Sequence, residues 1–505
     1  PHIMNLKKIM VVLCLAWVGS FFLAGAQDAE YEAFLKQQEQ QFKQFMESKA
    51  KAEQAELAAS GDLENPEVLK ATIQQLEQRL EVYDQPTAAN EKPQLQRNLD
   101  YVWVVTAAIL VFFMQVGFCM LEMGLVRSKN CINVAMKNVI DFSAVAISYL
   151  LFGFYFMYGM SSDGGGGFIG SGSFSLWTEP GDSPVWTFWF FQVVFAATCC
   201  TIASGAMAER TKFVGYLIYT VILSGLIYPV FGHWAWGSLG GDFGFGGASG
   251  WLEDLGFHDF AGSTVVHGIG GATALAGIII LGPRVGRFGP NGEPRYIPGH
   301  SLPLAAFGTL VLWVGWFGFN AGSSVEGSAE LGRVCANTAV AGGAGCIVAM
   351  AFFWIIRGIP NVLVALNGIL GGLVAVTACC DVVNPLHSLI IGAIAGVVST
   401  AGAILLEKMG LDDVVGAVPV HLFNGMWGTI AVAIFNENGF KVNALGIQAF
   451  GTIAICLGAF GIALVLFKVI DTLVGLRAND DDQEDGLDFA EHSANAYPDF
   501  QTTER

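Results

Sequence analysis

Two histidines lie at matching positions inside apolar stretches of the chain. His267 follows Asp259 by eight residues, and His421 follows Asp413 by the same interval. The apolar run after Asp259 is long enough to cross a bilayer as a helix. Eight residues of helix rise roughly 12 Å, so an aspartate at the membrane face places its histidine near the midplane. Ionisable groups at that depth usually mark a path for an ion or a proton.

This histidine pair indicates what such a path would carry. Two facing neutral imidazoles can accept and pass protons. A hydrated alkali ion would bear a large desolvation cost in a narrow apolar lumen, whereas a cation that can lose its proton, such as ammonium, suits it. Two alternatives remain open from the residues alone: His267 and His421 could be unrelated packing residues, or they could ligate a haem in a redox protein.

The composition is that of a membrane protein. The 505 residues have a mean hydropathy of +0.53, and 13% of them are charged. Much of the net charge of −18 lies before Leu99 and after Ala478, and no basic stripe indicates a nucleic-acid partner. The ten cysteines lack zinc-type spacing. We therefore expect an all-α polytopic membrane protein.

Eleven apolar runs predict eleven transmembrane helices. They cover residues 100–125, 132–160, 185–208, 213–238, 260–282, 301–322, 334–356, 361–380, 386–406, 416–435 and 445–470. The first ten form two halves of five, and an odd number makes the halves enter the membrane from opposite sides. Such inverted repeats place their sites at the repeat interface, near the midplane. His267 and His421 are then expected to meet there, with the eleventh helix outside the repeat.

The charged residues between the runs predict the orientation. Alternate ends carry mostly basic or mostly acidic residues. The basic set contains Arg127, Lys129, Arg210, Lys212, Arg284, Arg287, Arg295, Arg357, Lys408, Lys468 and Arg477. By the positive-inside rule these ends face the cytoplasm. We therefore predict a multi-pass protein of the cytoplasmic membrane, with its N-terminus outside and the acidic tail, residues 471–505, in the cytoplasm.

Two segments precede the predicted membrane domain, residues 98–470. Residues 1–26 are interpreted as a tag remnant (1–3) and a signal peptide, since Lys7 and Lys8 precede an apolar run that ends at Ala24-Gly25-Ala26. An uncleaved span is the alternative. Residues 27–97 predict two short extracytoplasmic helices with a coiled-coil-like stripe. A packing role within an oligomer and a ligand-binding role both remain open for them.

The chain also resembles a known family, the Amt/Mep/Rh ammonium transporters, and the Amt branch in particular. The resemblance runs from about Asn98 to Tyr497 and rests on a set of motifs. These are Val126-Arg127-Ser128-Lys129-Asn130, Gly205-Ala206-Met207-Ala208-Glu209-Arg210, the stretch from Asp259 to His267, the stretch from Gly315 to Ser323, Asp412-Asp413 leading to His421, and Gly486-Leu487-Asp488 with Ala496-Tyr497.

The resemblance implies a homotrimer with one pore per subunit, which is not an enzyme and has no metal or cofactor. It also assigns roles to individual residues. Trp236 and Ser323 would bind ammonium at the outer face, above a gate of stacked Phe195 and Phe319. Asp259 would organise that end electrostatically, and His267 and His421 would relay the proton, with Thr377 at a further pore-lining position. Most aromatics near helix ends are interfacial anchors, which is the alternative for the aromatic residues. The tail would dock under the trimer and could bind a PII-type protein.

Three departures from the family pattern bear on function. Glu122 stands where other members carry an aromatic residue, and it is either a buried structural carboxylate or a second ionic site. Gly416 replaces an acidic residue, and His492-Ser493 departs from the usual tail. The expected function is ammonium transport, with methylammonium as an alternative substrate. The other hypothesis is an ammonium receptor of the same fold, coupled to a signalling domain beyond Arg505.

Overall fold

The computed structural model describes residues 94–159, 167–170, 176, 179–243 and 248–500. The predicted tag remnant and signal peptide (1–26) lie outside the described residues, and so does the extracytoplasmic segment 27–97 as far as residue 93. Regular structure in the described part is helical, apart from three isolated bridges between single residues. The predicted all-α class is confirmed.

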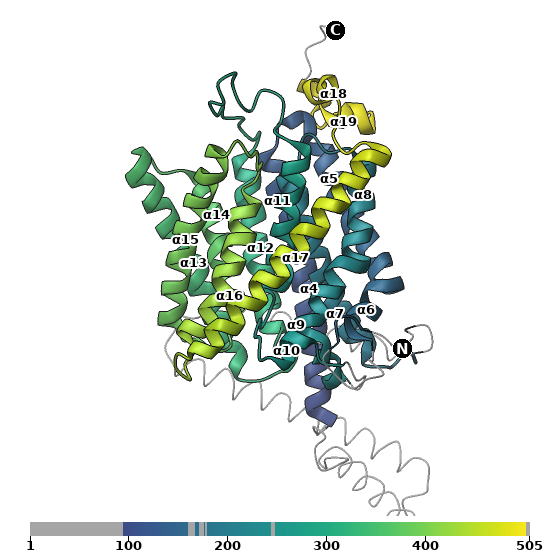
Figure 1. Cartoon of the computed structure of the whole chain (residues 1–505), viewed down its shortest axis with the longest axis vertical. Helices are drawn as coiled ribbons and strands as arrows, with labels where there is room; N and C mark the ends of the chain where they lie inside the picture. The colour runs from purple at the N-terminus through teal and green to yellow at the C-terminus, as the bar shows by residue number, and fades with distance from the viewer. Residues whose placement is uncertain (1–93, 160–166, 171–175, 177–178, 244–247, 501–505) are drawn as a thin grey trace, which may run out of the picture. The chain divides into compact units, whose positions relative to one another are not determined.

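Ten helical segments of the described part are long and apolar enough to cross a membrane, and they run side by side in Figure 1. They are α4 (Gln94–Leu125), α5 to α6 (Cys131–Ser148 and Phe154–Tyr158), α7 (Val185–Ala206), α8 to α9 (Phe213–Ile222 and Tyr228–Trp236), Ser263–Leu281 with α11 (Ile269–Leu281), α12 (Leu302–Gly322), α13 (Glu330–Arg357), α15 (Pro385–Lys408), Val418–Phe435 with α16 (Asn424–Phe435), and α17 (Val442–Val474). The eighth predicted span, 361–380, is a shorter apolar helix, α14 (Val362–Thr377). Each of the eleven predicted runs thus corresponds to a helix.

Four of these segments contain a turn of π-helix. The turns are η3 (Tyr149–Gly153), η5 (Leu223–Ile227), η7 (Ser263–Gly268) and η8 (Val418–Phe423). η7 opens the segment that continues as α11, and η8 opens the segment that continues as α16. π-Helical turns are rare and occur frequently at functional sites. Both intramembrane histidines, His267 and His421, lie in such a turn.

The two ends of the helices differ. One end, which we name the tail end, carries α18 (Asp480–Asp485) and α19 (Leu487–His492), and the opposite far end carries α10 (Trp251–Asp254) (Figure 1). α17 crosses obliquely between the two ends and contacts α8, α11 and α16. This places the segments with η7 and η8 in the interior, between α17 on one side and α7 and α14 on the other.

Carboxylates of the tail attach it to two helix starts. Asp488 accepts a hydrogen bond from the backbone N–H of Asn133 in the first turn of α5, at 2.7 Å. Glu491 accepts from the N–H of Phe213, the first residue of α8, at 2.9 Å. Negative groups are favourable at helix N-termini because the N–H groups there lack partners within the helix. The tail therefore supplies capping groups that α5 and α8 do not contain.

Glycines allow α13, α14 and α15 to pack with their backbones in contact. A methyl group on Gly345 of α13 would lie 2.2 Å from the backbone oxygen of Gly368 in α14. A methyl group on Gly396 of α15 would lie 2.5 Å from the oxygen of Gly345. Small residues at helix contacts are typical of membrane proteins, in which close packing contributes much of the association energy.

We predict that Gly345→Ala destabilises the protein by about 1–3 kcal/mol, because the new methyl meets rigid backbone. The matched control is Gly343→Ala on the same helix, where a methyl group has no neighbour within 4 Å. That control gains helix propensity and should keep or raise the melting temperature. Thermal unfolding of both variants in detergent is the measurement, and equal melting temperatures would contradict the proposed packing.

Candidate functional site

The two intramembrane histidines are in direct contact. Nδ1 of His267 lies 3.1 Å from Nδ1 of His421, and the ring centroids are 5.2 Å apart with 18° between the planes, so the two imidazoles meet edge to edge. His267 is fully buried and His421 is 3% exposed. In such a pair one imidazole donates through Nδ1–H and the other accepts, so the tautomers are complementary. The prediction that the two histidines meet is confirmed, and the contact forms a bridge along which a proton can pass.

An aspartate and a glycine position each histidine in the same way. Both carboxylate oxygens of Asp259 accept hydrogen bonds from four consecutive N–H groups, Gly262 to Val265, at 2.8–3.0 Å. The carboxylate of Asp413 accepts from three, Gly416 to Val418. These bonds supply partners for the free N–H groups at the start of η7 and of η8. Since the histidines lie in those turns, the two caps fix their depth.

The glycine of each cap has a left-handed backbone. Gly262 has φ +110° and Gly416 has φ +81°, three residues after the respective aspartate. Glycine adopts this conformation without steric cost. The left-handed backbone at position 416 therefore explains why this chain has glycine there instead of the acidic residue of other family members. Burial raises the pKa of Asp259 and of Asp413 above the ordinary value, and the backbone N–H donors partly offset that rise.

Aromatic rings form a column that leads from the far end to the histidines. Phe195 of α7 stacks on Phe319 of α12 with centroids 4.0 Å apart. Trp236 lies edge-on to Phe195 at 6.3 Å, and Phe319 contacts the His267 ring at 5.4 Å. The four rings come from four different segments, α7, α9, α12 and η7. The structure thus brings together Trp236, Phe195, Phe319 and His267, as the motifs predicted, while their roles stay predictions.

Three further predicted residues border this column. The indole N–H of Trp236 donates to the backbone oxygen of Asp259 at 2.7 Å, which joins the ring to the cap of η7. The hydroxyl of Ser323 donates to the backbone oxygen of Phe319 in its own helix. The hydroxyl of Thr377 accepts from the indole N–H of a tryptophan at 2.9 Å, and its backbone oxygen accepts from the N–H of Ala261, between Asp259 and η7.

That tryptophan, Trp316, had no assigned role in the sequence analysis. Its ring stacks on His267 with centroids 5.1 Å apart and 16° between the planes, and it is fully buried. Residues three apart on a helix share a face, so its spacing from Phe319 was the available signal. The flat indole ring packs against the His267 imidazole and restricts its orientation.

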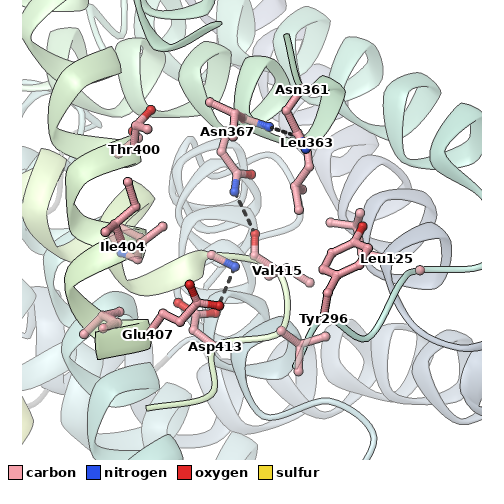
Figure 2. Close-up of a pocket in the computed structure, with 18 of the residues that line it drawn as sticks. Leu125, Tyr296, Asn361, Leu363, Asn367, Thr400, Ile404, Glu407, Asp413 and Val415 are labelled. Atoms are coloured by element: carbon pink, nitrogen blue, oxygen red, sulfur yellow. Dashed lines mark hydrogen bonds between the residues drawn. The ribbon is translucent and has the colours of Figure 1, made fainter. Parts of the chain in front are cut away.

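Two cavities lie between the histidines and the tail end. The larger has a volume of about 310 Å³ and is lined by Asp413, Asn367, Tyr296 and Glu407 among others (Figure 2). In Figure 2 the Asn367 amide points to the backbone oxygen of Val415, to which it donates at 3.0 Å. The smaller has about 10 Å³, room for one water-sized molecule. The smaller cavity reaches His421, and three residues of its wall, Asn367, Val415 and Gly416, also line the larger one.

The tail end also holds a buried network of charges. Arg284 donates to both oxygens of Asp412 at 2.9 and 3.0 Å and lies 3.5 Å from Glu209. Arg210 donates to the backbone oxygen of Asp412 at 2.6 Å. Burial alone would raise the pKa of Asp412, but the hydrogen bonds from Arg284 and the charges of both arginines hold it well below its ordinary value. The network joins the loops after α7, α11 and α15.

The family model described as the Ammonium Transporter Family matches residues 102–497. This chain belongs to the ammonium transporter family. The resemblance seen in the motifs is therefore confirmed.

Relatives of this ammonium transporter family member are similar over most of their length. Ammonium transporter Amt2 of Archaeoglobus fulgidus is 43% identical over 441 residues, which are 82% of this chain and 91% of that protein. Ammonium transporter 3 of Dictyostelium discoideum is 36% identical over 425 residues, 80% of this chain and 95% of that protein.

Solved structures of the family share the fold. A structure described as a sensor Amt protein superposes with a TM-score of 0.74 at 38% identity, covering 79% of this chain and all of that one. Candida albicans Mep2 gives a TM-score of 0.68 at 26% identity, covering 76% of this chain and 87% of that one. The membrane domain is thus an Amt/Mep fold.

We predict that Asp259→Ala destabilises the protein by at least about 2 kcal/mol, because four N–H groups lose a charged acceptor in an apolar environment. The control is Asp254→Ala in α10, whose side chain is exposed and should change stability by less than about 0.5 kcal/mol. Thermal unfolding compares the two. If Asp259→Ala and the control have the same melting temperature, the hydrogen bonds of Asp259 do not stabilise η7.

Proposed function

We propose that this chain transports ammonium across the cytoplasmic membrane, through the aromatic column and the histidine pair. The observation that carries the proposal is the contact between His267 and His421, buried between the column and the tail-end cavities. Family membership favours a transporter over an enzyme. A pair of imidazoles in an apolar passage suits a cation that can give up a proton and cross in part as a neutral molecule.

The steps follow from the chemistry along the column. Ammonium binds at the far end, where the Trp236 ring face attracts a cation and Ser323 offers a hydroxyl oxygen. Phe195 and Phe319 are in contact, so one ring has to move before the solute can pass. An N–H bond of ammonium then breaks, and the proton goes to a ring nitrogen of the histidine pair. Ammonia continues beside Thr377 and the histidines toward the cavities.

Asp259 acts on this path through position rather than by contact with ammonium. Its carboxylate is occupied by four backbone N–H groups, and its backbone oxygen holds the Trp236 indole. We propose that Asp259 keeps the residues of the far end in place and fixes the depth of His267 in the membrane. The tail end is assigned to the cytoplasm by the positive-inside rule, since Arg210, Arg284 and Arg477 gather there.

A homotrimer, with one pore in each subunit, is the assembly that the family resemblance supports. The tail attaches to α5 and α8 of its own chain, and its acidic α18 remains available for a PII-type protein. Cross-linking and mass measurement in detergent test the trimer, and a pull-down with a PII protein tests that partner.

A second function, ammonium sensing, is favoured by one specific observation. The structure described as a sensor Amt protein resembles this chain over the whole of its own length. A sensor would use the same column with little flux, and it would pass the signal to a further domain. The experiment below separates the two, because binding without current is the mark of a sensor.

We predict that the purified protein in liposomes gives an ammonium-dependent current. His267→Ala should reduce that current by at least about 100-fold, which is the scale of a lost proton-transfer group. In His267→Asp the current should be lost or should no longer distinguish ammonium from potassium. His387→Ala is the matched control, since that histidine contacts Phe435 at 5.5 Å and is not part of the column. Wild-type protein that binds ammonium without current would favour the sensor.

A further inference from the structure

Glu122 of α4 is a carboxylate buried inside the membrane domain, and it is 1% exposed. Its Oε2 accepts hydrogen bonds from Asn138 Nδ2 at 2.9 Å and from Ser204 Oγ at 3.0 Å. No arginine, lysine or histidine of the described residues forms an ion pair with it. The buried ammonium group of Lys137 acts on Glu122 only from beyond ion-pair distance. A buried carboxylate without an ion-pair partner is costly, which favours the uptake of a proton or a mobile cation.

The cavity of about 10 Å³ joins this carboxylate to the pore. Its wall contains both Glu122 and His421, together with apolar groups such as Phe118 and Ile202. The volume admits one molecule the size of water, which is also the size class of ammonia and ammonium. Whatever occupies it lies between the inner histidine and the only acidic side chain in that wall.

This cavity adjoins the larger one at the tail end. Asn367, Val415 and Gly416 line both. A molecule that leaves the Glu122 cavity by this wall arrives beside Asp413 and Glu407, in the space shown in Figure 2. His421 and Glu122 thus share one small cavity, which adjoins the larger one through these three residues.

The second oxygen of Glu122 lies on the side of this passage. The two described donors both bond to Oε2. A methyl group on Gly205 would lie 3.0 Å from Oε1 and 2.7 Å from Cγ2 of Val415, so Oε1 is close to a residue that lines both cavities. Gly205 leaves the space that this oxygen needs. One oxygen is thus held by two donors, and the described residues provide no hydrogen bond to the other.

We propose that Glu122 and His421 form an inner ammonium site, at which the proton and ammonia recombine. The inference rests on the proposed transport. The N–H bond of the protonated His421 breaks and the proton passes to a Glu122 oxygen, which leaves a neutral imidazole and a carboxylic acid. Ammonia in the small cavity then takes that proton. The O–H bond breaks, an N–H bond forms, and ammonium remains paired with the Glu122 carboxylate until it leaves for the vestibule.

A second buried acid in the same region provides a matched control. Asp141 of α5 is fully buried and accepts from Thr220 Oγ1 at 3.2 Å. It lines neither of the two cavities. Asp141→Asn and Glu122→Gln each remove one buried carboxylate, and the amide oxygen keeps an acceptor for the neighbouring donors. The two variants therefore differ in whether the removed carboxylate lines the cavity beside His421.

The first test is the ammonium-dependent current of both variants in liposomes. Glu122→Gln should lower the current by about 100-fold, because the recombination step loses its proton donor. Asp141→Asn should keep the wild-type current, and thermal unfolding shows whether each variant is folded. Equal currents in Glu122→Gln and wild type would overturn the inference, even though the transport proposal would stand.

The second test does not depend on current. Infrared difference spectra with and without ammonium chloride should show a carboxylic-acid carbonyl band in wild type and in Asp141→Asn. The band should be absent in Glu122→Gln. If that variant does not fold, Ser204→Ala keeps the carboxylate, removes one donor and should shift the band. A band that persists in Glu122→Gln, or does not move in Ser204→Ala, would overturn the inference; a wild type with this band but without current would overturn only transport.

Discussion

The hydrogen bonds between two aspartates and the first turns of two helices are the interaction on which the pore depends. Asp259 and Asp413 each supply a charged acceptor to a row of backbone N–H groups that would otherwise lack partners in an apolar environment. Because those turns contain His267 and His421, the caps set the depth of both imidazoles. The carboxylates thus serve the site without contacting a solute.

The caps also explain why polar and apolar parts of the passage are separated. Between the caps the passage is lined largely by aromatic rings, and the paired imidazoles lie among them. At the tail end, by contrast, charges such as Arg284 and Asp412 are paired with each other. Desolvated charge is tolerated there because it is compensated within the network.

Much of this arrangement could be predicted from the sequence, because periodicity and charge report local structure. The eleven apolar runs and the repeated interval from aspartate to histidine were sufficient to predict the helices and the contact of His267 with His421. The π-helical turns were not predictable, since no residue type specifies them. The link between Glu122 and His421 joins residues almost 300 positions apart, and pattern alone carries no information on such pairs. The aromatic group at residues 316–323 was expected at the outer face, but the contact of Trp316 with His267 was not predicted, because sequence does not distinguish such an indole from an ordinary core residue.

The stacked rings of Phe195 and Phe319 limit how fast a solute can pass along the proposed pathway. Two rings with centroids 4.0 Å apart and almost no exposed surface leave no continuous opening, so this conformation is occluded. Turnover in the proposed pathway would then be timed by rotation of a ring within a packed interior rather than by diffusion through water. Such rotations require transient loosening of the neighbouring side chains, as close-packed interiors resist change. The molecule would accordingly behave as a carrier with a thermal barrier and not as an open conduit.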